Sequence, residues 1–109
     1  MKKDSIFDLA DLSGIGEEVF SAILSTPSVK LERIVSKGQV TPEGFWYDQN
    51  LDEWVILLRG EATILFENAE TVNLMPGDYL LIPAHAKHRV TYTSSDPECV
   101  WLALHGELK

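Results

Sequence analysis

Asp48–Gly60 reads Asp-Gln-Asn-Leu-Asp-Glu-Trp-Val-Ile-Leu-Leu-Arg-Gly, and this stretch decides the fold. It opens as a polar, acidic turn and continues into four consecutive apolar residues, Val55–Leu58. Successive strand residues point to opposite faces, so both faces of a strand over 53–58 need cover. Glu53 stands at its start, where a carboxylate is either exposed at a barrel mouth or buried with a partner. The rest of the chain is expected to surround this strand.

Outward from this strand, short apolar stretches alternate with turn residues that contain glycine, proline or asparagine. Roughly seven to nine short strands at such spacing predict an antiparallel sandwich or barrel. The tight connection at 59–61 predicts a hairpin in which the strand over 53–58 returns over 62–66. The other expected strands cover residues 29–36, 45–47, 71–74, 79–82, 89–93 and 100–105.

Residues 1–27 are predicted to form a helical segment ahead of a β-barrel over 29–106, within one domain of 109 residues. Ile15, Val19 and Ile23 lie four residues apart, a spacing that predicts one apolar face of a short helix. Two glutamates at its start suit the helix dipole, and a proline ends it. Such a segment would pack on the barrel as a lid or serve as a dimer arm.

The composition is that of a globular domain with an acidic surface. Hydrophobic residues make up 45% of the chain, which argues against disorder. The net charge of −8 comes from 17 acidic and 9 basic residues, and the basic residues are scattered. Nucleic acid is therefore not an expected partner, because no basic cluster exists to bind phosphates.

Cysteine content and hydropathy favour an intracellular protein. Cys99 is the single cysteine, so an intrachain disulfide is excluded and the residue is expected to pack as a small apolar side chain. The N-terminal lysines are followed by acidic residues, and no stretch approaches the ~20 apolar residues of a membrane span. We expect a cytoplasmic protein with no membrane partner.

One pattern near the C-terminal half is diagnostic of a family. Gly77 is followed after five residues by Pro83, after one more by His85 and after another two by His88. This pattern resembles the second motif of the cupin superfamily, although the family has glycine at His85 and asparagine at Tyr92. The resemblance covers residues 44–105 and implies an all-β, jelly-roll β-barrel or sandwich.

The first cupin motif is only partly present. It ends with a glutamate and, after six residues, a glycine, and Glu53 and Gly60 match that spacing. Upstream, the family has two histidines separated by one residue. Those positions hold Tyr47 and Gln49 for the shorter family spacing, or Trp46 and Asp48 for the longer one.

The resemblance implies a metal site built from the two motif-one histidines, the glutamate and the motif-two histidine. Glu53 and His88 carry over, and Gln49, Asp48 and His85 are the candidates to complete the set. Such donors suit a divalent ion such as Zn, Mn, Fe or Ni. The alternative is a degenerate cupin in which Glu53 and His88 form an ion pair inside the barrel mouth.

Strand alternation predicts which side chains line the barrel. If Glu53 points inward, Val55 and Leu57 do too, whereas Trp54, Ile56 and Leu58 face outward. An apolar outer face of this size predicts a homodimer or cover by the N-terminal segment. The same reasoning points His88 and Tyr92 inward, and Tyr47, Tyr92 and Phe45 are expected to frame a substrate pocket.

Two further polar residues, His105 and Arg33, are not counted among the expected metal or substrate contacts. His105 is expected to be an ordinary residue at a strand end. Arg33 falls in phase with Val29, Leu31 and Val35, which places it on an apolar face, where it would pair with an acidic residue or contact an anionic ligand.

Three functions stay open because fold does not determine function. The first is a metal-dependent enzyme that acts on a small molecule, and the second is a metabolite-binding module without a metal requirement. The third is a structural homodimer with a vestigial barrel. No residue pattern in the chain names a catalytic group or a reaction.

Overall fold

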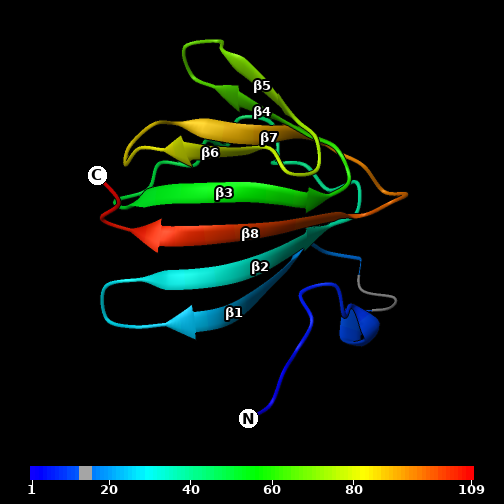
Figure 1. Cartoon of the computed structure of the whole chain (residues 1–109). Helices are drawn as coiled ribbons and strands as arrows, with labels where there is room; N and C mark the ends of the chain where they lie inside the picture. The colour runs from blue at the N-terminus through cyan, green and yellow to red at the C-terminus, as the bar shows by residue number, and fades with distance from the viewer. Residues whose placement is uncertain (13–15) are drawn as a thin grey trace.

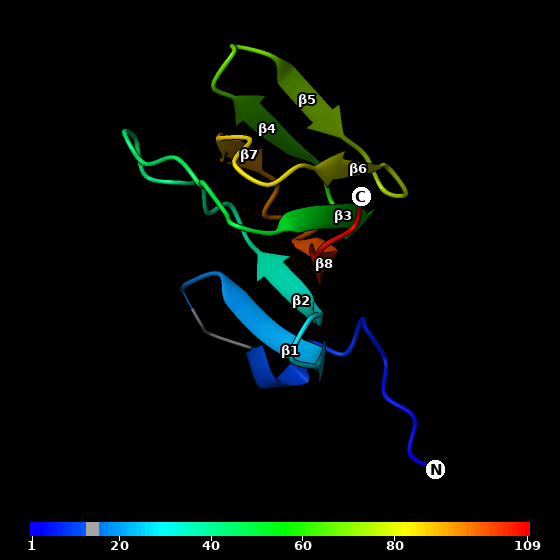
Figure 2. The same cartoon turned by 90° about the vertical axis from the view of Figure 1, so that its left-hand side faces the viewer.

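Two antiparallel sheets face each other in a computed structural model that describes residues 1–12 and 16–109 (Figures 1 and 2). The strand order is β1-β2-β8-β3-β6 in the five-stranded sheet and β5-β4-β7 in the three-stranded sheet. The elements are η1 (Ala10–Leu12), β1 (Val19–Ser25), β2 (Lys30–Ser36), β3 (Asp52–Arg59), β4 (Ala62–Phe66), β5 (Thr71–Leu74), β6 (Tyr79–Ile82), β7 (His88–Thr93) and β8 (Cys99–Gly106). The all-β jelly-roll prediction is confirmed.

The strand from which the sequence analysis started is an interior strand of the larger sheet. β3 pairs with β8 on one side and β6 on the other, and Val55 and Leu57 point into the core as predicted. Leu57 is fully buried, and it shares the core with Trp101 from β8 and Ile64 from β4. The two sheets are therefore held together by side chains that alternate inward along each strand.

The predicted hairpin at 59–61 is wrong, because the chain changes sheet there. β3 belongs to the larger sheet and β4 to the smaller, so 59–61 is a corner that links the two layers. Gly60 has a φ of +88°, and a Cβ on it would lie 2.9 Å from the Cα of Cys99. This corner needs a residue without a side chain, both for its backbone conformation and for the close approach of β8.

We expect Gly60→Ala to lower the free energy of unfolding by about 2 kcal/mol, since it adds a steric clash to the strain of a left-handed backbone. Gly77→Ala is the matched control, because Gly77 has a φ of +94° but nothing within 4 Å of its added Cβ. It should cost only about 1 kcal/mol. Urea unfolding of both variants measures the difference, and equal losses would show that the contact with Cys99 has no energetic effect.

The predicted N-terminal helix is also wrong, because Val19–Ser25 is strand β1. It pairs with β2 at the edge of the larger sheet, with Val19 opposite Val35. A spacing of four residues is even, so it places side chains on one face of a strand as well as on one face of a helix. Helical structure within residues 1–12 is confined to η1, and Ile15 lies outside the described residues.

The stretch 45–47, predicted as a strand, makes only an isolated bridge between Tyr47 and His88. The N-terminal segment lies against the outer face of the larger sheet near β1 and β2 (Figures 1 and 2). There Arg33 Nη1 donates to the carbonyl oxygens of Ile6 at 3.2 Å and Asp8 at 2.8 Å. Arg33 was predicted to pair with an acidic side chain or an anionic ligand. In the structure it instead holds the N-terminal segment against the sheet through two backbone carbonyl groups. No helix among the described residues is long and apolar enough to cross a membrane.

Candidate functional site

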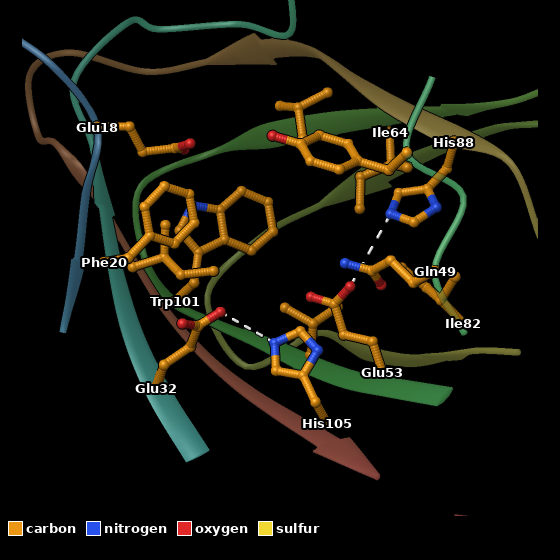
Figure 3. A pocket seen from close by; sticks show the side chains of 14 residues that line it. Glu18, Phe20, Glu32, Gln49, Glu53, Ile64, Ile82, His88, Trp101 and His105 are labelled. Atoms are coloured by element: carbon orange, nitrogen blue, oxygen red, sulfur yellow. Dashed lines mark hydrogen bonds and ion pairs between the residues drawn. The ribbon is translucent and has the colours of Figure 1, made fainter. Parts of the chain in front are cut away.

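A cavity of about 90 Å³ opens between the two sheets (Figure 3). Its volume accommodates several water molecules or one small ligand. One part of the wall is apolar and is formed by side chains such as Phe20, Ile64 and Trp101. The polar part of the lining consists of Glu18, Glu32, Tyr47, Gln49, Glu53, His88 and His105.

Glu53 and His88 face each other across this cavity. The Nε2 of His88 lies 3.9 Å from Oε1 of Glu53, which is too long for a hydrogen bond. The Nδ1 of His88 lies 2.8 Å from the carbonyl oxygen of Ala86. Because a carbonyl only accepts, Nδ1 carries the hydrogen, and in the neutral ring Nε2 presents its lone pair to the cavity.

The backbone on either side fixes the His88 ring. Tyr47 and His88 exchange backbone hydrogen bonds of 2.8 and 3.1 Å, and their rings stack with centroids 5.6 Å apart. Phe66, opposite His88 in the β4–β7 ladder, lies against the same imidazole with centroids 5.9 Å apart. The imidazole is therefore held in one orientation before any ligand arrives.

A second carboxylate–imidazole pair lies on the other side of Glu53. His105 Nε2 donates to Oε1 of Glu32 at 2.9 Å, and Lys30 Nζ lies 3.1 Å from the other oxygen of Glu32. In the β3–β8 ladder Glu53 stands directly opposite His105, so Glu53 is placed between His88 and His105 (Figure 3). These groups can accept and return protons in a site that is largely closed to water.

Burial controls the protonation of the acidic lining. The pKa of Glu53 is raised by its burial, an effect that the positive potential of His105 and His88 opposes. The pKa of Glu18 is also raised, chiefly by burial, although a hydrogen bond from Ser36 opposes the rise. Burial likewise raises the pKa of the Tyr47 hydroxyl. A positively charged group or a hydrogen-bond donor in the cavity would therefore stabilise the ionised forms of Glu18 and Glu53.

Comparison with known proteins places this architecture in a family. The profile of the cupin domain matches residues 33–105. The chain belongs to the cupin family. A search of curated proteins found no significant match.

Solved cupin-like structures agree with this membership. A Ralstonia eutropha JMP134 protein named "putative mannose-6-phosphate isomerase" is 41% identical, with 98% of this chain and 99% of that chain covered and a TM-score of 0.89. A cupin superfamily protein from Desulfitobacterium hafniense DCB-2 is 20% identical, with 84% and 79% covered and a TM-score of 0.72. An RmlC-like cupin from Methanocaldococcus jannaschii is 21% identical, with 87% and 84% covered and a TM-score of 0.70. The last two show the fold alone.

The structure separates the predicted cupin ligands into two groups. Glu53, His88 and Gln49 line the cavity. Asp48 and His85 do not, and instead pair with each other at 2.8 Å on the surface, where their side chains are 42% and 64% exposed. The structure therefore does not bring Asp48 and His85 into the cavity with Glu53 and His88.

Of the three aromatic residues expected to frame the pocket, only Tyr47 lines it. Phe45 is 52% exposed and packs edge-on against Tyr47 with centroids 5.2 Å apart. Tyr92 is 49% exposed, because a register shift in the β4–β7 ladder between Thr63 and Ile64 breaks the alternation. Thr93, and not Tyr92, is buried as a result.

Sequence reasoning missed Glu32 and His105 as pocket residues. Period-two alternation along β8 puts His105 on the inward face with Trp101 and Ala103, and that signal was available. Around β2 the apolar residues Val29, Leu31 and Val35 predicted that their face points into the barrel. In the structure Glu32, on the opposite face, lines the cavity instead. The partner that makes burial of Glu32 tolerable is His105, 73 positions away.

The residues fit a metal ion only in part. His88 offers a free Nε2 with its tautomer fixed, Glu53 offers a carboxylate and Gln49 an amide oxygen. Among the described residues, however, no group of three or more His, Cys, Asp or Glu side chains could hold an ion. Structural and catalytic sites for Zn usually supply at least three such ligands, so this donor set is too small for a tightly held ion.

Proposed function

We propose that this cupin binds a small molecule in its barrel, with Glu53, His88 and the Glu32–His105 pair as the polar contacts. One observation carries the proposal. Glu53 is only 8% exposed, and its side chain faces the cavity and accepts no hydrogen bond from the described residues. The Nε2 of His88 has no partner either, so the polar atoms of both side chains are open to the cavity. Polar groups that converge on a largely apolar pocket without protein partners are typical of a ligand site, so this pair points to a ligand that contacts both.

A screen of small polar compounds of about 150 Da or less, observed by protein NMR, tests the proposal. Bound compounds should shift the indole N–H signal of Trp101, which lines the cavity, and leave that of Trp54, on the outer sheet face, unchanged. Ile34→Trp, which fills the cavity, should reduce binding at least tenfold. Leu65→Trp is the control, because Leu65 is not part of the lining. A screen in which no compound of any charge shifts Trp101 would contradict the proposal.

A divalent ion is a second candidate ligand, favoured by the free Nε2 of His88 beside Glu53 and Gln49. An ion there would supply a Lewis acid, while His88 and Glu53 hold it and Tyr47 borders it. His88→Ala should then lower the uptake of Zn, Mn, Fe or Ni titrated into the untagged protein by at least tenfold. His85→Ala, which alters an exposed histidine outside the cavity, should leave this uptake unchanged. An equal loss in both variants would place the ion outside the barrel.

We further propose that the chain forms a homodimer through the outer face of the larger sheet. In register, Leu81, Trp54, Leu104 and Leu31 form one row across β6, β3, β8 and β2. Tyr79, Ile56 and Leu102 form the adjacent row. We call these seven residues the outer patch. Such a contiguous apolar surface on a sheet is typical of a protein–protein interface.

A further inference from the structure

The charge of the cavity wall is one-sided. Three carboxylates, from Glu18, Glu32 and Glu53, line it, and none of the described lysine or arginine residues does. The ammonium of Lys30, whose side chain is 52% exposed, lies 3.1 Å from Glu32 and is paired with it. An anion in this cavity would meet carboxylates without a permanent positive charge to hold it.

The hydrogen-bonding pattern is equally one-sided. Glu32 is satisfied by His105, and Glu18 accepts a hydrogen bond from Ser36. The carboxylate of Glu53 and the Nε2 lone pair of neutral His88 are both acceptors, 3.9 Å apart, and neither has a donor. A ligand group that bridges them must donate at least two hydrogen bonds, which an ammonium does and a single hydroxyl does not.

The apolar wall completes the arrangement. Figure 3 shows the rings of Phe20 and Trp101 close together on the side of the cavity that also carries Glu18. The indole Nε1 of Trp101 donates to Ser36 at 3.2 Å, which fixes the ring and leaves its face available. Aromatic faces attract cations as well as alkyl groups. They suit the carbon chain of a small amine.

We infer that the barrel takes a small primary amine in its protonated form, with the ammonium bridging Glu53 and His88 Nε2. The inference rests on the proposed function and specifies the ligand class for the same site. The name of the Ralstonia protein refers to a phosphate ester, mannose-6-phosphate. A phosphate ester would need a cationic contact, and none of the described lysine or arginine residues lines this cavity, so we do not expect this chain to bind one.

Three probes that share a propyl chain and differ in the charge of their head group test the preference: n-propylammonium, n-propanol and n-propyl phosphate. Each is titrated into the full chain at pH 7.5 with EDTA present, so that metal ions do not contribute. We expect n-propylammonium to shift the Trp101 indole signal with an affinity at least tenfold above that of n-propanol, and n-propyl phosphate to give no saturable shift. Glu53→Gln should weaken n-propylammonium binding at least tenfold, whereas Glu70→Gln, at an exposed turn between β4 and β5, should not change it.

The outcomes separate this inference from the proposed function. Tighter binding of n-propyl phosphate or n-propanol than of n-propylammonium would overturn the amine assignment while the barrel stays a ligand site. Binding of n-propylammonium that Glu53→Gln leaves unchanged would also overturn it. If Glu53→Gln proves misfolded, His88→Leu provides the second test, because leucine has no hydrogen-bond acceptor, and it should weaken n-propylammonium binding at least fivefold. Failure of every compound in the screen would remove the proposed function itself.

Discussion

Glu53→Gln is expected to be more stable than the unmodified chain at pH 8, by about 1–3 kcal/mol, while it loses ligand binding. The side chain of Glu53 is largely buried and accepts no hydrogen bond from the described residues, and this burial disfavours its ionised form. A neutral amide of the same shape avoids that cost. A gain in stability combined with a loss of binding is typical of a residue kept for function.

The pH dependence follows from the raised pKa of Glu53 in the folded chain. Between the ordinary glutamate value and the raised pKa, the folded chain holds a proton that the unfolded chain has released. Stability therefore falls as pH rises through this window, and the loss persists above it. His105, His88 and Glu32 face Glu53. Where the imidazoles are protonated they lower the pKa of Glu53 and make the loss of stability smaller, whereas the carboxylate of Glu32 raises that pKa and makes the loss larger.

Urea unfolding of both chains from pH 4 to pH 8 measures this prediction. The advantage of Glu53→Gln should be near zero at pH 4 and should grow as pH rises. Glu70→Gln, at an exposed position, should track the unmodified chain throughout. A Glu53→Gln chain that is less stable at pH 8 would mean that Glu53 is satisfied in the folded state, and the ligand argument would lose its basis.

The sequence predicted the strands well where burial dictates a pattern. The apolar run over 53–58 predicts a strand inside the sheet with both faces covered. β3 lies between β8 and β6, and its inward side chains Val55 and Leu57 are in the core. Pro76 and Gly77 lie in the turn between β5 and β6, and Pro83 directly follows β6. Helix and strand were confused only for residues 19–25, where a four-residue spacing fits both periods.

The site was harder to predict because it depends on register between distant strands. Glu53 and His88 followed from motif spacing, which is local. The proximity of His105 to Glu53 depends on the β3–β8 ladder, and the exclusion of Tyr92 depends on one register shift. Strand alternation indicates that His105 faces inward, but it does not indicate which residue of another strand lies opposite. A bulge changes the facing of every later residue in its strand, and the sequence pattern does not reveal the bulge.

Trp54→Glu is expected to convert the proposed homodimer into a monomer. Trp54 lies at the centre of the outer patch, between Leu81 on β6 and Leu104 on β8, and its ring packs against that of Tyr79 with centroids 5.4 Å apart. In a twofold dimer each substitution occurs twice. If each tryptophan contributes about 2 kcal/mol, the dissociation constant rises by roughly a thousandfold.

Analytical ultracentrifugation over a range of protein concentrations measures the dissociation constant. Tyr92→Glu is the matched control, because Tyr92 is also a partly exposed aromatic residue but lies on β7 in the smaller sheet. It should leave the dimer intact, and thermal unfolding should show that both variants fold. A Trp54→Glu chain that sediments as a dimer would show that the interface lies elsewhere. An unmodified chain that stays monomeric at high concentration would contradict the homodimer proposal.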